Sequence, residues 1–211
     1  MRTLIALVAV VASVALGQTT YQIPFVSSGN TIELTVANTA AIALAGVKAE
    51  ATELPSWLKF DATQKSIGLL KAQQEISATF TFSVDKIAPV QKSQTLKFVI
   101  SAPTGEKWVK EITVAVSAPE KFEVFQNYPN PFNPSTTISY QLTANSKVNL
   151  RIFNMLGQEV ASLVDGDRLA GYHQEMWDAG RFSSGVYVYQ VIAADEHGMK
   201  QVERKRMMLL K

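Results

Sequence analysis

Residues that could do chemistry are few in this chain, and none falls into a diagnostic pattern. His173 stands two residues before Glu175, and such a pair on one strand face can touch a metal ion. A catalytic zinc site needs three protein ligands, and neither His197 nor any other residue supplies a third at a suitable spacing. The chain has no cysteine, which excludes thiolate nucleophiles, disulfides and cysteine-type metal sites. The sequence therefore predicts neither a metal site nor a cofactor.

Patterns for hydrolysis are equally weak. Ser184, His173 and Asp178 supply the residue types of a catalytic triad, but the Gly-x-Ser-x-Gly elbow that presents a nucleophile is missing. Glycosidases use paired carboxylates, and 18 acidic residues will form some pairs by accident. The segment 165–167 (D-G-D) resembles part of a calcium loop without the remaining ligands, so a turn between strands explains it. We predict that the protein is not an enzyme.

The elements that would position any site are β-strands. Apolar and polar residues alternate in segment after segment, and no segment after residue 18 sustains a helical period. In the first half the expected strands are 31–36, 76–84, 96–100 and 112–116, with weaker ones at 42–50 and 66–70. In the second half they are 136–142, 146–154, 158–164, 172–178, 185–194 and 199–210. This pattern is typical of sandwiches, so we predict an all-β chain with two tandem immunoglobulin-like β-sandwich domains.

The first residues have the pattern of a secretory signal peptide. Arg2 precedes an apolar run from Leu4 to Leu16, and small residues flank a cleavage position before Gln18. The run is shorter than the ~20 apolar residues that a membrane-spanning helix needs. We therefore predict a cleaved signal peptide at 1–17, which implies export through the Sec translocon.

A short polar segment with a proline divides the rest of the chain. Residues 119–121 (P-E-K) follow the last strand pattern of the first half, and such segments mark domain boundaries. We predict one immunoglobulin-like domain at 18–118, a linker at 119–121 and a second domain at 122–211. Each has about 100 residues, which is enough to bury a core.

Charge is nearly balanced, with 20 Lys and Arg residues against 18 Asp and Glu residues. No basic surface of the kind that nucleic acids require follows from this balance. One basic cluster, Arg204-Lys205-Arg206, lies within a strand pattern. Because charge on an edge strand discourages aggregation, we interpret the cluster as a solvated edge.

The segment 125–138 (F-Q-N-Y-P-N-P-F-N-P-S-T-T-I) is the most unusual in the chain. Its three prolines each fix their own φ near −65° and push the preceding residue toward extended geometry, and its asparagines tolerate turns. A helix is therefore excluded, and a stiff, kinked entry into a β domain remains. A chemical site does not need such a string, whereas a label that other proteins read can use it.

This string and four later motifs resemble the type A C-terminal sorting domain of proteins exported by the type IX secretion system of Bacteroidota and related bacteria. The later motifs are V-x-L-x-I-F-N-x-x-G-Q-x-V at 148–160, G-Y-H with W-D at 171–178, S-G-V-Y-V-Y at 184–189 and M-M-L-L-K at 207–211. The resemblance covers 122–211. It implies that the sorting signal includes Asn127, Pro129, Asn130, Pro131, Phe132, Asn133, Pro134, Gly157, Trp177, Gly185, Tyr187, Leu210 and Lys211.

The resemblance also implies partners and a destination. The outer-membrane translocon of the type IX system would recognise 122–211, and a sorting peptidase would remove it by cutting the linker. The protein would reach the cell surface or the medium through the periplasm. Because 207–210 is apolar on both faces of a strand, we predict that it adds as a strand to a receptor. The alternative is that it closes its own sheet, and the two roles are compatible at different stages.

Residues 18–118 would be the cargo. The segment 54–60 (L-P-S-W-L-K-F) resembles the P-x-W-L segment of bacterial immunoglobulin-like modules, and 75–100 resembles their hairpin, although Gln91 stands where glycine is usual. Trp57 is either a plug between the sheets, which we favour, or a platform for stacking a glycan. We predict a non-enzymatic structural module of the cell surface. The alternative is an adhesin or carbohydrate-binding module with a surface glycan or protein ligand.

Overall fold

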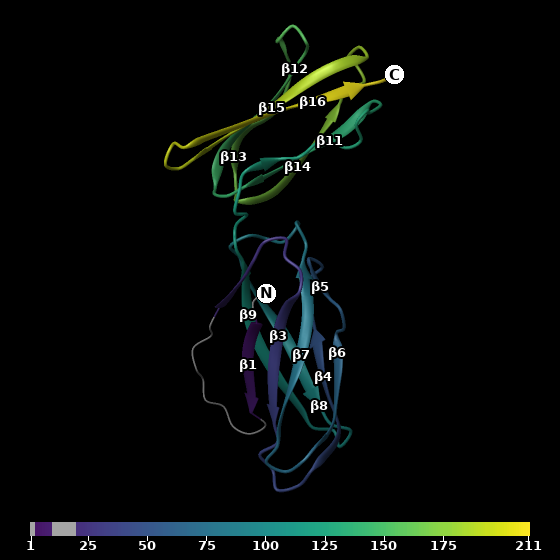
Figure 1. The fold of residues 1–211 in the computed structure, drawn as a ribbon, viewed down its shortest axis with the longest axis vertical. Coiled ribbons are helices and arrows are strands. Elements are labelled where there is room, and N and C mark those ends of the chain that lie inside the picture. The colour runs from purple at the N-terminus through teal and green to yellow at the C-terminus, as the bar shows by residue number, and fades with distance from the viewer. Residues whose placement is uncertain (1–2, 10–19) are drawn as a thin grey trace. The chain divides into compact units, whose positions relative to one another are not determined.

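The computed structural model describes residues 3–9 and 20–211, which form strands β1 to β16 and no helix (Figure 1). The predicted all-β class is therefore confirmed. Within these residues no helix offers the length and apolarity that crossing a membrane demands. The chain divides into two compact units, Met1–Ser117 and Ala118–Lys211.

The first unit is a sandwich of two sheets. One sheet has the order β1 (Thr3–Ala9), β3 (Asn30–Ala37), β7 (Glu75–Val84) and β5 (Leu58–Phe60). The other has the order β2 (Thr20–Ile23), β9 (Lys107–Val116), β8 (Ser93–Ser101), β4 (Leu44–Thr52) and β6 (Gln64–Leu70). The strands expected from alternation are all present, while β1, β2 and the short β5 were not expected as strands.

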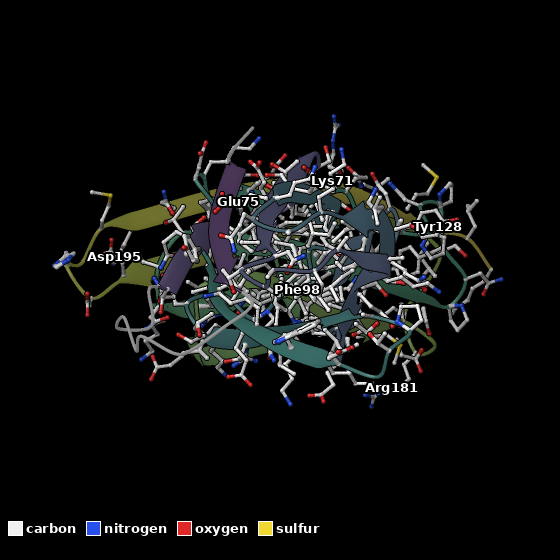
Figure 2. All side chains as sticks on the ribbon, turned by 90° about the horizontal axis from the view of Figure 1, so that it is seen from below. Lys71, Glu75, Phe98, Tyr128, Arg181 and Asp195 are labelled. Atoms are coloured by element: carbon white, nitrogen blue, oxygen red, sulfur yellow. The ribbon has the colours of Figure 1, made fainter. Side chains whose placement is uncertain are left out.

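Alternation fills the core of this unit from both sheets. Leu34, Phe80 and Phe98 are fully buried, and Phe98 lies among crowded interior side chains in Figure 2. The rings of Phe80 and Phe98 are 5.2 Å apart, and Phe60 stacks on Phe82 at the same separation of 5.2 Å. Trp57 is only 7% exposed and belongs to this core. The prediction that Trp57 plugs the sandwich is confirmed.

The predicted signal peptide lies only partly within the described residues. Its residues 3–9 form β1, which pairs in parallel with β3 from Thr3↔Thr31 to Ala9↔Ala37. The remainder, 1–2 and 10–17, lies outside them. Because β1 is an edge strand, cleavage before Gln18 would remove it from the sheet.

The second unit is also built from two sheets. One has the order β10 (Glu123–Val124), β11 (Ser135–Leu142) and β14 (Gly171–Asp178). The other has the order β13 (Glu159–Arg168), β12 (Ser146–Phe153), β15 (Gly185–Asp195) and β16 (Lys200–Leu209). All six expected strands are present; β13 runs past its expected end at 164, and the two-residue β10 was not expected. As predicted for the basic cluster, β16 is an edge strand.

Candidate functional site

The histidines serve the fold. The Nε2–H group of His173 donates to the carbonyl of Leu169 at 2.7 Å, and its ring stacks on Tyr140 with 5.2 Å between ring centres. His197 lies in an exposed turn. Among the residues that the structure describes, no three His, Asp or Glu side chains gather as metal ligands would.

The residue types of a triad are likewise engaged in turns. The Oδ1 atom of Asp178 accepts the backbone N–H of Gly180 at 2.8 Å. The carbonyl of Ser183 accepts the hydroxyl of Tyr187 at 2.8 Å, and Ser184 Oγ accepts the N–H of Lys211 at 3.0 Å. These contacts shape the ends of β14 and β15. The candidate site is therefore sought in the proline–asparagine segment.

Asn127 organises that segment from inside. Its side chain is buried, and its Nδ2 group donates to the carbonyl of Pro129 at 3.0 Å and to Thr136 Oγ1 at 2.9 Å. Thr136 Oγ1 in turn donates to the same carbonyl at 2.8 Å. A buried amide with its donors satisfied fixes one loop geometry. The loop therefore closes on itself before the chain enters β11.

Tyr189 ties this loop to the opposite sheet. Its hydroxyl accepts the N–H of Asn127 at 3.0 Å and donates to the carbonyl of Phe125 at 2.8 Å. Burial raises the pKa of Tyr189 to about 12, so the hydroxyl keeps its proton and serves as both donor and acceptor. The sequence motif at 184–189 included Tyr189, but only the fold shows that it holds a segment more than sixty residues away.

Phe132 is the apolar anchor of the loop. It is 2% exposed, and its ring lies 5.5 Å from that of Trp177. Trp177 also contacts Phe182 at 5.5 Å and Tyr187 at 5.2 Å between ring centres. Such aromatic pairs add to the free energy of simple burial. Three predicted signal residues, Phe132, Trp177 and Tyr187, thus come together in one cluster.

The loop also clamps the last strand. The N–H of Phe132 donates to the carbonyl of Met208 at 2.9 Å, and the N–H of Leu210 donates to the carbonyl of Phe132 at 3.0 Å. Asn130 Oδ1 accepts the N–H of Met208 at 3.0 Å. Lys211 donates from Nζ to the carbonyl of Gly180 at 2.8 Å. We call these contacts the terminal clamp.

The terminal clamp bears on the two roles predicted for 207–210. Met207 and Leu209 are buried in the core of their own unit, and β16 pairs with β15 along its whole length. The free edge of the strand at Met208 and Leu210 is already occupied by residues 130–132. The strand closes its own sheet, and strand addition at this stretch would require the clamp to open.

Two predicted signal glycines occupy positions that suit glycine. Gly157 has φ +77° in the tight turn between β12 and β13, where Asn154 Oδ1 accepts the N–H groups of Leu156 and Gln158, both at 3.0 Å. Gly185 has φ +153° at the start of β15. Side chains with a Cβ rarely adopt such φ values. Both glycines therefore serve the chain path.

The remaining signal residues are displayed at the surface. The exposed members of the predicted signal are Pro129, Asn130, Pro131, Asn133, Pro134, Leu210 and Lys211. Tyr128, which was not among the predicted signal residues, is 82% exposed and projects outward beside them in Figure 2. The peptide bonds before Pro129, Pro131 and Pro134 are all cis, a feature that the sequence analysis did not predict. The site thus consists of buried anchors beneath an exposed, stiff loop.

The family model described as "Secretion system C-terminal sorting domain" matches residues 126–203. These residues therefore match a secretion-system sorting domain, in agreement with the resemblance found from the sequence motifs. The match begins one residue before Asn127 and ends within β16, so 204–211 lie beyond it. A sorting domain of this kind implies interaction with the type IX machinery and export to the cell surface or the medium.

Solved structures add no further argument. Dimeric latent PorU from Porphyromonas gingivalis is 13% identical, with 93% of this chain and 19% of that chain covered and a TM-score of 0.36. The CupB2 chaperone from Pseudomonas aeruginosa is 10% identical, with 89% and 97% covered and a TM-score of 0.28. CBD12 from CALX1.2 is 8% identical, with 87% and 78% covered and a TM-score of 0.37. At such TM-scores the similarities establish neither fold nor function. No curated protein matches the chain.

Proposed function

We propose that the chain is a non-enzymatic exported protein in which 18–118 is a structural module of the cell surface. The Sec translocon carries it to the periplasm, and the type IX translocon then recognises the sorting domain and moves it across the outer membrane. One observation carries the proposal: the match at 126–203 coincides with a folded unit in which distant motif residues meet around one exposed loop.

The surface of the first unit supports a structural role over glycan binding. Glycan-binding sites commonly present exposed aromatic rings, but Trp57 is buried and Trp108 packs against the core. Within the described part of this unit, the exposed large apolar side chains are aliphatic: Val26, Ile42, Leu69, Ile87 and Val109. The adhesin alternative therefore lacks the aromatic platform that motivated it.

The linker supports the proposed cleavage. No strand lies between the end of β9 at Val116 and the start of β10 at Glu123, and Glu120 and Lys121 are exposed. Proteases cut exposed segments far more readily than paired strands. The sorting peptidase is therefore expected to cut close to the Glu120–Lys121 bond.

A truncation tests the proposed route. In a host with a type IX system, the full chain should reach the cell surface, and a chain that ends at Ser117 should stay in the periplasm. Residues 118–211, fused behind a signal peptide and an inert periplasmic protein, should carry that protein outward. Surface display of the truncated chain at the full-length level would overturn the proposal.

A further inference from the structure

The outer face of β16 combines cations with exposed aliphatic side chains. Alternation along the strand buries Met207 and Leu209 and turns the neighbouring positions outward. The outward row, from one end to the other, is Lys200, Val202, Arg204, Arg206 and Met208, all of them exposed. A solvated edge strand, as predicted from the sequence, accounts for the exposed cations of this row. It does not account for the exposed aliphatic side chains of Val202 and Met208.

The neighbouring strand β15 extends this face with apolar residues. The cross-strand pairs in the outer row are Val188↔Arg206, Gln190↔Arg204, Ile192↔Val202 and Ala194↔Lys200. None of the outward positions on β15 or β16 is acidic. We call this surface, the outward residues of β15 and β16, the basic–aliphatic face.

The two arginines on this face lack carboxylate partners. Elsewhere in the same unit Arg151 pairs with Glu159 at 3.1 Å and Arg168 with Glu175 at 3.4 Å, but among the described residues no ion pair involves Arg204 or Arg206. The nearest acid along the strand, Glu203, faces the other way and accepts the N–H of Val124 at 3.2 Å. The guanidinium groups are therefore available to an external anion.

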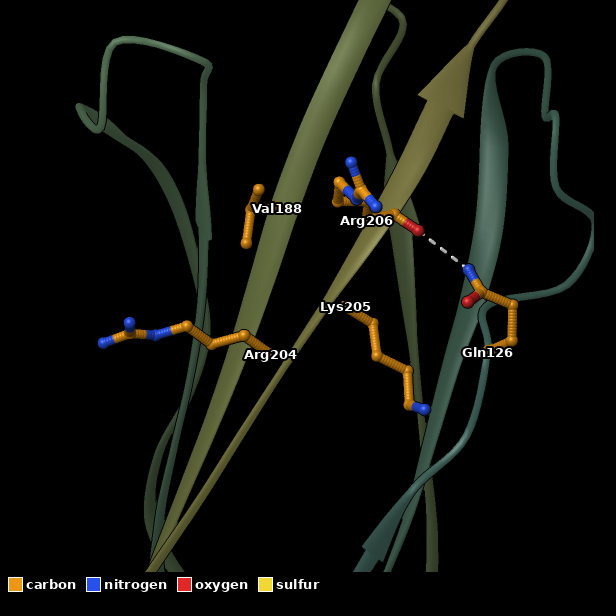
Figure 3. Close-up of a pocket in the computed structure, with 5 residues that line it drawn as sticks. All are labelled: Gln126, Val188, Arg204, Lys205 and Arg206. Carbon is orange, nitrogen blue, oxygen red and sulfur yellow. Dashed lines mark hydrogen bonds between the residues drawn. The ribbon is translucent and has the colours of Figure 1, made fainter.

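A hollow lies at these arginines. It has a volume of about 300 Å³ and is lined by Gln126, Val188, Arg204, Lys205 and Arg206. In Figure 3 Arg204 extends on the side of Val188, while Lys205 extends on the other side, toward Gln126. Gln126 Nε2 donates to the carbonyl of Arg206 at 2.8 Å, which fixes one wall. Positions two apart on a strand are separated by roughly 7 Å, so two guanidinium forks can contact neighbouring phosphate groups.

We propose that the basic–aliphatic face docks on a membrane surface whose lipids carry phosphate groups. Arg204 and Arg206 bind the phosphates, while Val202 and Met208 contact the apolar boundary beneath them. The intermixing of cations and aliphatic side chains in one row favours a lipid surface, because phosphate and hydrocarbon lie next to each other there. The docking is a property of the sorting domain itself and does not depend on the proposed export route.

Vesicle binding tests this proposal. Residues 18–211 are used, because the apolar run of the signal peptide would bind lipid by itself. The protein should sediment with vesicles of phosphatidylcholine and phosphatidylglycerol, and hardly at all with phosphatidylcholine alone. Since each cation near an anionic surface contributes about fivefold to binding, Arg204→Gln with Arg206→Gln should lower the partition coefficient roughly 20-fold. Added salt should weaken the wild type more than the variant.

A matched control removes the same charge elsewhere. Lys48 and Lys107 are exposed on a sheet of the first unit, so Lys48→Gln with Lys107→Gln should bind almost as the wild type does. Unchanged circular dichroism and melting of both double variants exclude misfolding. Met208→Gln tests the aliphatic part and should cost a few-fold in binding.

Four results would overturn the proposal. The first is equal binding to both kinds of vesicle, and the second is an equal loss in the arginine and lysine variants. The third is arginine-dependent binding to a polyglutamate peptide without binding to vesicles, which would identify an acidic protein as the partner. Release from vesicles by millimolar inorganic phosphate at constant ionic strength would mean that the hollow prefers free phosphate, and that result too would contradict lipid docking.

Discussion

The two sandwiches are stabilised internally by different kinds of interaction. In the first, Asn38 donates to the carbonyls of Ile42 and Leu70, and the rest of the core is aromatic and aliphatic packing. In the second, Asn127 and Tyr189 form a polar network that links the proline–asparagine segment to β11 and β15. The comparison teaches that apolar packing dominates the first core, whereas in the second a buried polar network also fixes one loop shape.

The largest difference between the units is expected when 207–211 is deleted. Each lost buried side chain, Met207 and Leu209, costs about 2–5 kcal/mol, and the loop loses its backbone partners. Calorimetry should show the transition of the first unit unchanged and that of the second unit lost, and export should cease. Normal export of this deletion variant would show that the terminal clamp is dispensable.

The two buried tryptophans allow a symmetric test. Trp57→Ala should destabilise the first unit by about 3–5 kcal/mol, and Trp177→Ala should do the same to the second. Each effect should stay within its own unit when unfolding in urea is followed for 18–118 and 122–211 separately. A loss below about 1 kcal/mol for Trp57→Ala would indicate that the side chain is not a core residue, and would favour the glycan-binding alternative.

The next largest difference between the units is expected in their stability at high pH. Burial raises the pKa values of Tyr140 and Tyr189 to about 12, so the folded second unit holds both protons more tightly than the unfolded chain. Its stability is complete below pH 10 and falls as the pH rises toward 12, by up to roughly 3 kcal/mol for each tyrosine. The first unit contains only Tyr21. Melting at pH 9 and pH 11 should therefore affect the second unit more, and equal losses would contradict this reason.

A smaller effect is expected from the network that fixes the loop. Tyr189→Phe removes an acceptor from the N–H of Asn127 and a donor from the carbonyl of Phe125, and leaving buried groups unpaired costs about 1–3 kcal/mol. Equilibrium unfolding of 122–211 measures this loss. Tyr128→Phe, at the exposed tip, is the control and should change stability by less than about 0.5 kcal/mol. Similar losses of unfolding free energy for the two variants would show that the Tyr189 hydroxyl does not stabilise the loop.

The smallest effect is expected on the basic edge. Arg204→Ala should change the free energy of unfolding by less than about 0.5 kcal/mol, because the side chain is exposed and lacks an ion-pair partner within the described residues. Urea titration of 122–211 checks this value. A loss above 1 kcal/mol would show that Arg204 supports the sheet, and would weaken its assignment to an external ligand.

The local alternation of apolar and polar residues predicted most of the strands. It could not predict most contacts of the site, because these join residues that are far apart in the sequence. Period-two alternation located all six main strands of the second unit, because one face of each is buried. The short strands β2, β5 and β10 were missed, since two to four residues carry too little alternation. The partners of Asn127 and Phe132, namely Tyr189, Trp177 and Met208, follow from sheet pairing. A motif can suggest such residues, but only the fold shows that they touch.

The terminal clamp makes the shape of the proline–asparagine loop depend on the strand that contains Met208. The loop is translated early in the domain, yet its backbone partners at Met208 and Leu210 arrive about eighty residues later. A chain that stops before β16 would contain the proline–asparagine motif, but the motif would lack the conformation that it has in the folded domain. The export machinery would then not recognise such a chain, although it contains the complete loop sequence.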